Sequence, residues 1–391
     1  MVADSAKTSL GELALLFLRL GSTALGGPAA HIALMRTEVV DRRGWFTDSE
    51  FLDMMGAVNL IPGPNSTELA IHIGRRRCGW AGLAVAGLCF ILPAALLVTV
   101  MAVLYVNYGR RPQTAAALYG VKPVVLALIV QAVIALARKA VRSVVLAACG
   151  VVALGAALQG ANALLLLLLA GGVLTGWHWY VNRRSSVSSA TTAGTASHSM
   201  ALLLAPVTAT SAASFSLGAL FLFFLKTGSV LFGSGYVLFA FLRDDLVARW
   251  HWLTEAQLLD AIAAGQLTPG PLSTTATFIG YLLGGIPGAV IASVGIFLPG
   301  FVFVAISGPL VPRMRRSRLC GAFLDGVNVA ALGLMSAVVV QLARAAVMDV
   351  VTLAVAVLAL AALVFAKRLN SVWLLAGGVA VGLARAMMAG H

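Results

Sequence analysis

Charge is scarce in this sequence. Only 10% of its 391 residues are Asp, Glu, Lys or Arg, whereas a soluble domain carries about 25%. Hydrophobic residues make up 60%, and the mean hydropathy is +0.96. A soluble globular enzyme is therefore not expected. The apolar runs are long rather than alternating, which excludes a β-barrel. The sequence predicts an all-α polytopic protein of the lipid bilayer, with room for about ten to thirteen crossings of ~20 residues each.

Motifs that carry catalytic or metal chemistry are also missing. The four cysteines lie far apart and mostly in apolar runs, so they predict neither a disulfide framework nor a metal site. No phosphate-binding loop and no Ser/His/Asp order is present. An ATP-driven pump and a membrane hydrolase are therefore unsupported, and we expect no enzyme, no cofactor and no metal. The first twenty residues lack a basic start and a cleavage site, so no signal peptide is expected.

Acidic residues are half as frequent as basic ones. The chain has 14 Asp and Glu against 27 Lys and Arg, which gives a net charge of +13. The basic residues stand in short loop clusters, such as those at 75–77 and 313–318. We interpret these clusters as topology signals that face the cytoplasm, and not as a surface for nucleic acid.

The chain contains two copies of one unit. Residues 17–64 align without a gap on residues 224–271, at an offset of 207, with eighteen identities in 48 positions. The identities include Trp45 with Trp252, Asp53 with Asp260, and the whole Pro-Gly-Pro triplet at 62–64 and 269–271. At an offset of 206 the similarity continues toward the end of each half. Charged and Trp positions match as well as apolar ones, so this is an internal repeat.

The join between the copies is rich in Ser, Thr and Ala. We predict a first repeat at 1–182, a flexible linker at 183–214 and a second repeat at 215–391. Each repeat is predicted to contain, in order, an apolar stretch, a charged amphipathic segment, a weakly apolar stretch broken by Pro-Gly-Pro, and four more strongly apolar helices. Duplication on this scale is typical of secondary transporters, although channels and membrane enzymes can be duplicated too.

Loop charge predicts the relative orientation of the two repeats. The arginines at 75–77 precede the helix expected at 79–106, whereas Arg313, Arg315, Arg316 and Arg318 follow the equivalent helix expected at 285–311. If positive loops face the cytoplasm, these two helices point in opposite directions. Arg111 and its neighbour at 110 follow the helix expected at 79–106, and so count against opposite orientations of the two helices. We expect inverted repeats, with Gly/Pro-broken helices or re-entrant hairpins at the repeat interface.

Two Gly/Pro interruptions occur at corresponding places in both halves. The first lies at 26–28 and 233–235, and the second at 62–67 and 269–274. Proline blocks helix continuation and frees backbone groups, which lipid cannot satisfy. Helix N-termini after the breaks would offer N–H groups and hydroxyls to an anion. Simple kinking or close packing is the competing interpretation. The predicted substrate-binding residues are Gly26, Gly27, Pro28, His31, Gly63, Asn65, Ser66, Thr67, Gly233, Gly235, Gly270, Ser273 and Thr274.

Acid–base candidates occur in the first half alone. Asn65, Glu68 and His72 share one helical face, and a carboxyl group within the membrane is costly. We predict a proton-coupling or gating role for Glu68 and His72. A capping box from Asn65 to Glu68, or a Glu68–His72 ion pair, is the alternative. The second copy carries Thr275 and Ile279 instead.

Basic side chains recur at equivalent positions. A basic charge is kept in both copies at Arg19 and Lys226 and again at Arg36 and Arg243, and Arg36 and Arg243 predict an anion-attracting vestibule. Snorkelling, or a salt bridge to Glu38 and Asp245, is the alternative. His31 follows the first break and is replaced by Leu238, so a packing role competes with a binding role.

These residues resemble those of the chromate ion transporter family in its long, two-domain form. The resemblance rests on Leu-Gly-Gly-Pro-Ala-Ala-His-Ile at 25–32, Gly-Trp-Phe at 44–46 and Asn-Leu-Ile-Pro-Gly-Pro-Asn-Ser-Thr-Glu at 59–68. In the second half it rests on residues 232–235 and 266–272. It covers both repeats and excludes the linker. Many members carry Gln where this chain has Glu68.

The resemblance implies a multi-pass carrier of the cell inner (plasma) membrane. Such a carrier moves chromate outward and confers resistance, with sulfate as a close analogue, and its repeats are antiparallel. We expect a chromate or sulfate oxyanion as the substrate, with efflux driven by the membrane potential or a proton gradient. Sulfate uptake is the alternative within transport. A non-transporting anion sensor or scaffold is the alternative of another class. A homodimer is left open.

Overall fold

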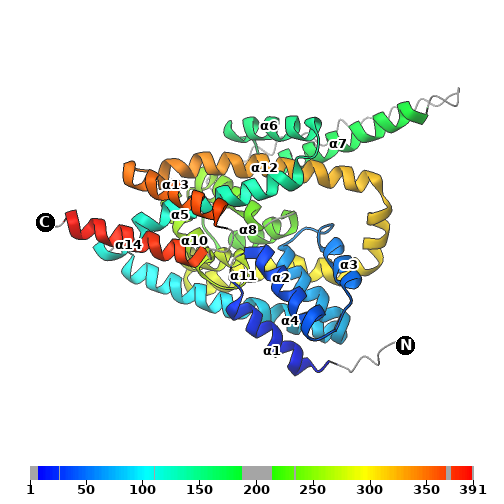
Figure 1. Ribbon diagram of the computed structural model, residues 1–391, viewed down its shortest axis with the longest axis horizontal. Helices are drawn as coiled ribbons and strands as arrows, with labels where there is room; N and C mark the ends of the chain where they lie inside the picture. The colour runs from blue at the N-terminus through cyan, green and yellow to red at the C-terminus, as the bar shows by residue number, and fades with distance from the viewer. Residues whose placement is uncertain are drawn as a thin grey trace.

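The computed structural model describes residues 8–25, 27–109, 111–186, 214–232, 235–366 and 371–389. Within these ranges the chain folds into helices and contains no strand (Figure 1). The first half comprises α1 (Leu10–Thr23), α2 (Gly27–Arg36), η1 (Thr37–Arg42), α3 (Asp48–Val58), α4 (Asn65–Tyr108), α5 (Pro112–Ala140), α6 (Val144–Leu158) and α7 (Ala163–Ser186). The second half comprises α8 (Leu217–Val230), η3 (Gly235–Val237), α9 (Leu238–Phe241), η4 (Leu242–Arg249), α10 (Glu255–Leu267), η5 (Leu272–Thr274), α11 (Thr275–Arg316), α12 (Arg318–Ala346), α13 (Val350–Phe365) and α14 (Ser371–Ala389).

The all-α membrane class predicted from the sequence is confirmed. Among the described residues, six helices are long and apolar enough to cross a membrane: α4, α5, α7, α11, α12 and α14. α7 continues to Ser186, and so enters the region predicted as linker. Residues 187–213 of that linker lie outside the described residues.

The first apolar stretch of each half is interrupted, as the glycines and proline predict. In the first half α1 ends at Thr23 and Ala24 takes an extended conformation, so that α2 starts afresh at Gly27. In the second half α8 ends at Val230 and η3 begins at Gly235. Neither piece is long enough to span ~30 Å of hydrocarbon at 1.5 Å per residue.

α4 and α11 each fold back on themselves as a helical hairpin. The turn in α4 falls at Gly79 (φ 64°, ψ −143°), and the turn in α11 falls at Gly285 (φ 61°, ψ −151°). These left-handed values cost an L-residue free energy, which is why glycine stands at both turns. The two arms of α11 touch where the hydroxyls of Thr277 and Ser293 lie 2.7 Å apart. The first arm of each hairpin is therefore a short helix that re-enters the bundle.

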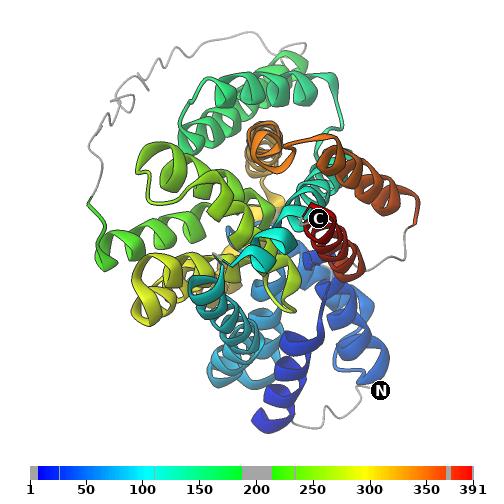
Figure 2. The ribbon, with the colours of Figure 1, turned by 90° about the vertical axis from the view of Figure 1, so that its left-hand side faces the viewer.

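The two halves exchange helices. α5 of the first half packs against α13 and α14 of the second, whereas α12 of the second half packs against α6 and α7 of the first (Figures 1 and 2). A Cβ atom at Gly120 would overlap the backbone of Gly378, and one at Gly326 would overlap the backbone of Ala170. Small residues let these helices approach closely, as in other membrane helix pairs. The two repeats thus form one body with a shared interface.

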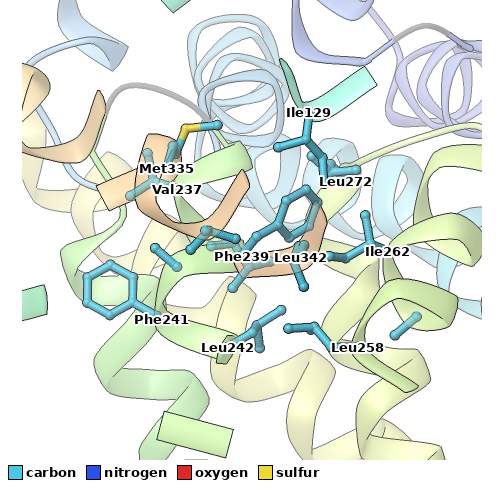
Figure 3. Packing of buried hydrophobic residues seen from close by; sticks show 14 of the residues in the cluster. Ile129, Val237, Phe239, Phe241, Leu242, Leu258, Ile262, Leu272, Met335 and Leu342 are labelled. Atoms are coloured by element: carbon cyan, nitrogen blue, oxygen red, sulfur yellow. The ribbon is translucent and has the colours of Figure 1, made fainter. Parts of the chain in front are cut away.

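The second half's broken helices lie in the middle of the apolar core. Figure 3 shows Phe239 and Leu242 facing Leu258 and Ile262 of α10, with Leu342 of α12 beside them. All of these side chains are buried. The core therefore encloses the segment that leads into the second Pro-Gly-Pro loop.

Candidate functional site

Each Pro-Gly-Pro loop meets the helix break of the other half. The Gly63 N–H donates to the Leu231 carbonyl at 2.6 Å, and the Gly270 N–H donates to the Ala24 carbonyl at 2.9 Å. Gly63 and Gly270 are equivalent at an offset of 207, and so are Ala24 and Leu231. The two bonds are therefore the same contact made twice. They satisfy backbone groups that lipid could not, because irregular backbone persists in a membrane only inside protein or beside water.

His31 reinforces one of these contacts. Its Nε2 lies 3.1 Å from the Ala24 carbonyl, and its ring stands edge-on to Phe90 at 5.8 Å. The side chain is 1% exposed. In this conformation His31 helps to hold the carbonyl at the end of α1, which favours a positioning role in the loop contact.

Hydroxyl groups line the start of both hairpins. Ser66, Thr67, Ser273 and Thr274 are all buried. The Thr274 hydroxyl donates to the Pro271 carbonyl at 2.8 Å. By contrast, the hydroxyls of Thr67 and Ser273 have no hydrogen-bond partner among the described residues. Two buried donors are thus left available at the helix N-termini, one from each repeat.

Asn65 does not cap α4. The helix N-cap is Pro64, and the Asn65 amide donates to the Asn59 side chain at 2.9 Å. The capping box considered between Asn65 and Glu68 is therefore absent. Pro64 accounts for this, because its fixed φ already places the chain for the first turn.

Glu68 is the most isolated acidic group among the described residues. Its side chain is 0% exposed, and neither carboxylate oxygen has a hydrogen-bond partner there. The ion pair considered with His72 is therefore not formed, and His72 is only partly buried. The Glu68 carboxylate lies beside Gly63 on one side and its Cγ beside Gly300 on the other. A buried acid without a partner is costly, so it marks a functional candidate.

The helix break of the first half, at Gly27, lies directly against the second half. A Cβ atom at Gly27 would lie 3.1 Å from the Tyr236 hydroxyl, and Gly235 lies beside Leu272. Pro28 follows within the first turn of α2. Two further candidates, Gly26 and Gly233, lie outside the described residues. The remaining predicted glycines thus come together around the two loops.

The predicted anion-attracting arginines are held in ion pairs. Arg36 bonds Asp48 at 2.5 Å and Asp41 at 3.2 Å, and Arg243 bonds Glu255 at 2.7 Å. Asp48 and Glu255 are equivalent positions, so this pair is also made twice. Of the acids considered from the sequence, Asp245 pairs with Lys226 at 2.5 Å, one of the salt bridges considered, whereas Glu38 binds Arg42 and Arg43. Neither acid pairs with Arg36 or Arg243 here. The reason is that the helical turn after each arginine places those acids on the opposite face.

Glu38 illustrates that alternative pairing. It bonds Arg42 at 2.6 Å and also Arg43. Burial acts to raise the pKa of the Glu38 carboxyl, but the hydrogen bonds and charges of Arg43 and Arg42 outweigh it, so the pKa lies below its ordinary value.

A polar cavity adjoins Arg243. It has a volume of about 320 Å³ and is lined by residues of both halves, including Gln159, Asp244 and Gln341. A second, larger cavity of about 620 Å³ lies between α4 and α11. Its exposed surface is almost wholly apolar, which makes it unsuited to an oxyanion. Of these two cavities, the one beside Arg243 has the chemistry of a vestibule.

The sequence reasoning missed a buried charge cluster. Lys122 of α5 lies 3.4 Å from Asp260 of α10, and the Tyr105 hydroxyl donates to the same carboxylate at 2.9 Å. Lys122 is the single charged residue between Pro112 and Ala137. A lone charge in so apolar a helix could have marked this position as a candidate. In the sequence, Asp260 stood out only as an identity of the internal repeat.

Sequence comparison identifies the family. A family model described as Chromate transporter matches residues 11–177 and 218–383. The chain belongs to the chromate transporter family. The matched regions cover both repeats and leave out the join between them. Among the described residues, no cluster of His, Cys, Asp or Glu could hold a metal ion.

Named relatives of this family member cover nearly its whole length. It is 31% identical to the chromate transport protein of Cupriavidus metallidurans over 382 residues, which cover 96% of this chain and 93% of the relative. It is 31% identical to the probable chromate transport protein of Synechococcus elongatus, over 90% of this chain and 89% of the relative. It is 34% identical to the chromate transport protein of Pseudomonas aeruginosa, over 84% and 80%. No solved structure matches the chain.

Proposed function

We propose that this protein is a secondary carrier that exports chromate across the plasma membrane. The observation that carries the proposal is the reciprocal hydrogen bonding of Gly63 to Leu231 and of Gly270 to Ala24. It draws two short re-entrant helices, one per repeat, into one interface. The relatives that are named as chromate transport proteins support the choice of substrate.

The chemistry at this interface suits a small oxyanion. α4 begins at Asn65 and the helical turns before α11 begin at Leu272, so both N-termini lie directly after the Pro-Gly-Pro loops. Helix N-termini attract anions through their N–H groups and the helix dipole. The unpartnered hydroxyls of Thr67 and Ser273 add one donor from each repeat. We propose that chromate binds among these groups once the interface opens.

Helix directions support inverted repeats. α13 runs parallel to α5, since Tyr119 bonds Asp349 and Gln131 bonds the Leu363 carbonyl. Two packed helices joined by a short turn run in opposite directions, and α13 follows α12 after a short turn. α12 therefore runs opposite to α5, its equivalent in the first repeat.

The same relation appears on the other side of the molecule. α6 runs parallel to α12, because Gly150 lies beside Val329 and Leu154 lies beside Gly333. α6 follows α5 after a short turn, so α5 again opposes α12. Two independent helix pairs thus favour an axis in the membrane plane, as in carriers with alternating access.

The membrane potential can drive export without a proton. With the cytoplasm negative, each charge gains about 2.3 kcal/mol per 100 mV, so a dianion gains about 4.6 kcal/mol. Glu68 adds a further element, because an ionised carboxylate beside the site would repel a dianion. We propose that Glu68 takes up a proton when the anion binds, so that the two bind together.

Flux in proteoliposomes tests the proposal. Purified protein is reconstituted, a voltage is imposed with potassium and valinomycin, and labelled chromate and sulfate are followed with and without a pH gradient. We expect saturable chromate flux that responds to voltage and is weaker for sulfate. Saturable sulfate uptake with little chromate flux would assign the sulfate role instead. Binding without flux of either anion would indicate a sensor or scaffold.

A further inference from the structure

Two equivalent helices have unequal burial. α3 and α10 each precede a Pro-Gly-Pro loop, at an offset of 207. Leu52 of α3 is 67% exposed, whereas its equivalent Leu259 of α10 is fully buried at 0%. Asp53 is exposed and its equivalent Asp260 is 5% exposed. α10 is therefore enclosed by the bundle, whereas its counterpart α3 lies at the surface.

A polar cluster holds the enclosed helix against the other repeat. Asp260 of α10 accepts a hydrogen bond from Tyr105 of α4 and faces Lys122 of α5, which is 15% exposed. Both partners belong to the first half. The equivalent cluster cannot form around Asp53, because the positions that match Tyr105 and Lys122 carry Val311 and Asn328. The cluster of Asp260, Lys122 and Tyr105 therefore has no counterpart of the same composition at Asp53.

The geometry of the cluster suits an interaction that opens. The Lys122–Asp260 separation of 3.4 Å exceeds the 2.7–2.9 Å usual for a charge-assisted bond. A buried pair must also offset the desolvation of both charges, so it adds little net stability. Removing one partner alone, however, leaves a buried charge uncompensated. The pair therefore adds little to the stability of the fold, but it favours the arrangement of α10 and α5 in which both charges are paired.

We propose that Asp260, Lys122 and Tyr105 form a latch that holds α10 closed in one of the two access states of the carrier. This inference rests on the proposed function, because a carrier with two repeats changes access by moving one against the other. In the opposite state the latch opens and α10 becomes as accessible as α3 is here. The three residues are positioning residues. They act on the Pro-Gly-Pro loop through α10 and do not contact the anion.

Cysteine accessibility tests the latch without any transport measurement. A single cysteine is placed at Leu259, and in a second variant at Ala263, where the change in size is small and the position is 2% exposed. The native cysteines are replaced, and Leu52→Cys serves as the accessible control. Labelling by a water-soluble thiol reagent is followed in proteoliposomes with the latch intact and with Lys122→Met and Asp260→Asn combined.

We expect the combined variant to speed labelling at positions 259 and 263 about tenfold, which corresponds to a 1.4 kcal/mol shift toward the open state. Labelling at position 52 should not rise. Exchanging the charges, with Lys122→Asp and Asp260→Lys together, should restore protection at 259 and 263. Protection that persists in the combined variant, or that the exchange fails to restore, would overturn the latch.

Chromate flux through the same variants separates the latch from the proposed function. With the latch open, the maximal rate should change while the KM for chromate stays within about twofold, because no anion contact is lost. A matching change in KM would show that these residues contact the anion and would overturn the positioning role. If the unaltered protein moves no chromate, the proposed function fails, and the labelling result still decides whether the latch exists.

Discussion

Replacing Gly63 with alanine should disturb the site through one identifiable neighbour. Gly63 has φ +146°, and a Cβ atom there would overlap the Glu68 carboxylate. Glu68 is fully buried and its Cγ lies beside Gly300, so the carboxylate must shift within the packed interior to make room. The backbone conformation should cost about 1–3 kcal/mol and the overlap another 1–3 kcal/mol. We therefore expect Gly63→Ala to lower the free energy of unfolding by about 2–6 kcal/mol.

A double-mutant cycle isolates the overlap. Glu68→Ala removes the obstructing carboxylate, so Gly63→Ala combined with Glu68→Ala should recover about 1–3 kcal/mol relative to the sum of the single changes. Gly270→Ala is the matched control. A Cβ atom there would meet Ala94 at 2.7 Å, so Glu68→Ala should bring no recovery. The free energies would be measured by denaturant unfolding in mixed micelles. Strict additivity of Gly63→Ala and Glu68→Ala would refute the view that Glu68 is clamped beside the loop.

Three further predictions follow from single residues. Glu68→Gln should weaken the pH dependence of chromate flux, because the proton site is lost; flux with an unchanged pH profile would remove Glu68 from coupling. Thr47→Ala and Thr254→Ala should each cost about 1 kcal/mol of unfolding free energy, because each deletes a capping box at the same place in its repeat; a large difference between them would show unequal caps. The Glu38 ion pairs should stabilise the fold above the carboxyl's ordinary pKa of 4.5 and lose that effect as pH falls below it. Glu38→Gln should therefore flatten the acid side of the stability profile; an unaltered profile would contradict this.

Local chemistry made the helix breaks predictable from the sequence. Proline and glycine act on their own backbone, so the interruptions near Pro28 and at Pro62 and Pro269 could be placed without a structure. The duplication was equally visible, because the repeat preserves polar positions such as Asp53 and Asp260. The breaks follow from local backbone chemistry, and the duplication follows from comparing the two halves directly; neither requires knowledge of how the helices pack.

Partners across the interface could not be predicted. The carbonyls that receive Gly63 and Gly270 lie in the opposite repeat, and their identity depends on how the halves dock. The same holds for Lys122, whose partner Asp260 is far away in sequence. A salt bridge from Arg36 to Glu38 was considered as the alternative to an anion-attracting role, but the helix between them sets their side chains on different faces, and Arg36 pairs with Asp48 instead. Long-range contacts decide each of these cases.

The KM for chromate of three hydroxyl variants tests the anion site most directly. Thr67→Val and Ser273→Ala each remove a buried hydroxyl that has no partner among the described residues, whereas Thr274→Val removes one that already bonds Pro271. A lost hydrogen bond to a charged ligand is worth about 1.5–3 kcal/mol. The first two variants should therefore raise the KM about 10- to 100-fold and the third should leave it nearly unchanged. Wild-type KM values for Thr67→Val and Ser273→Ala would place the anion elsewhere.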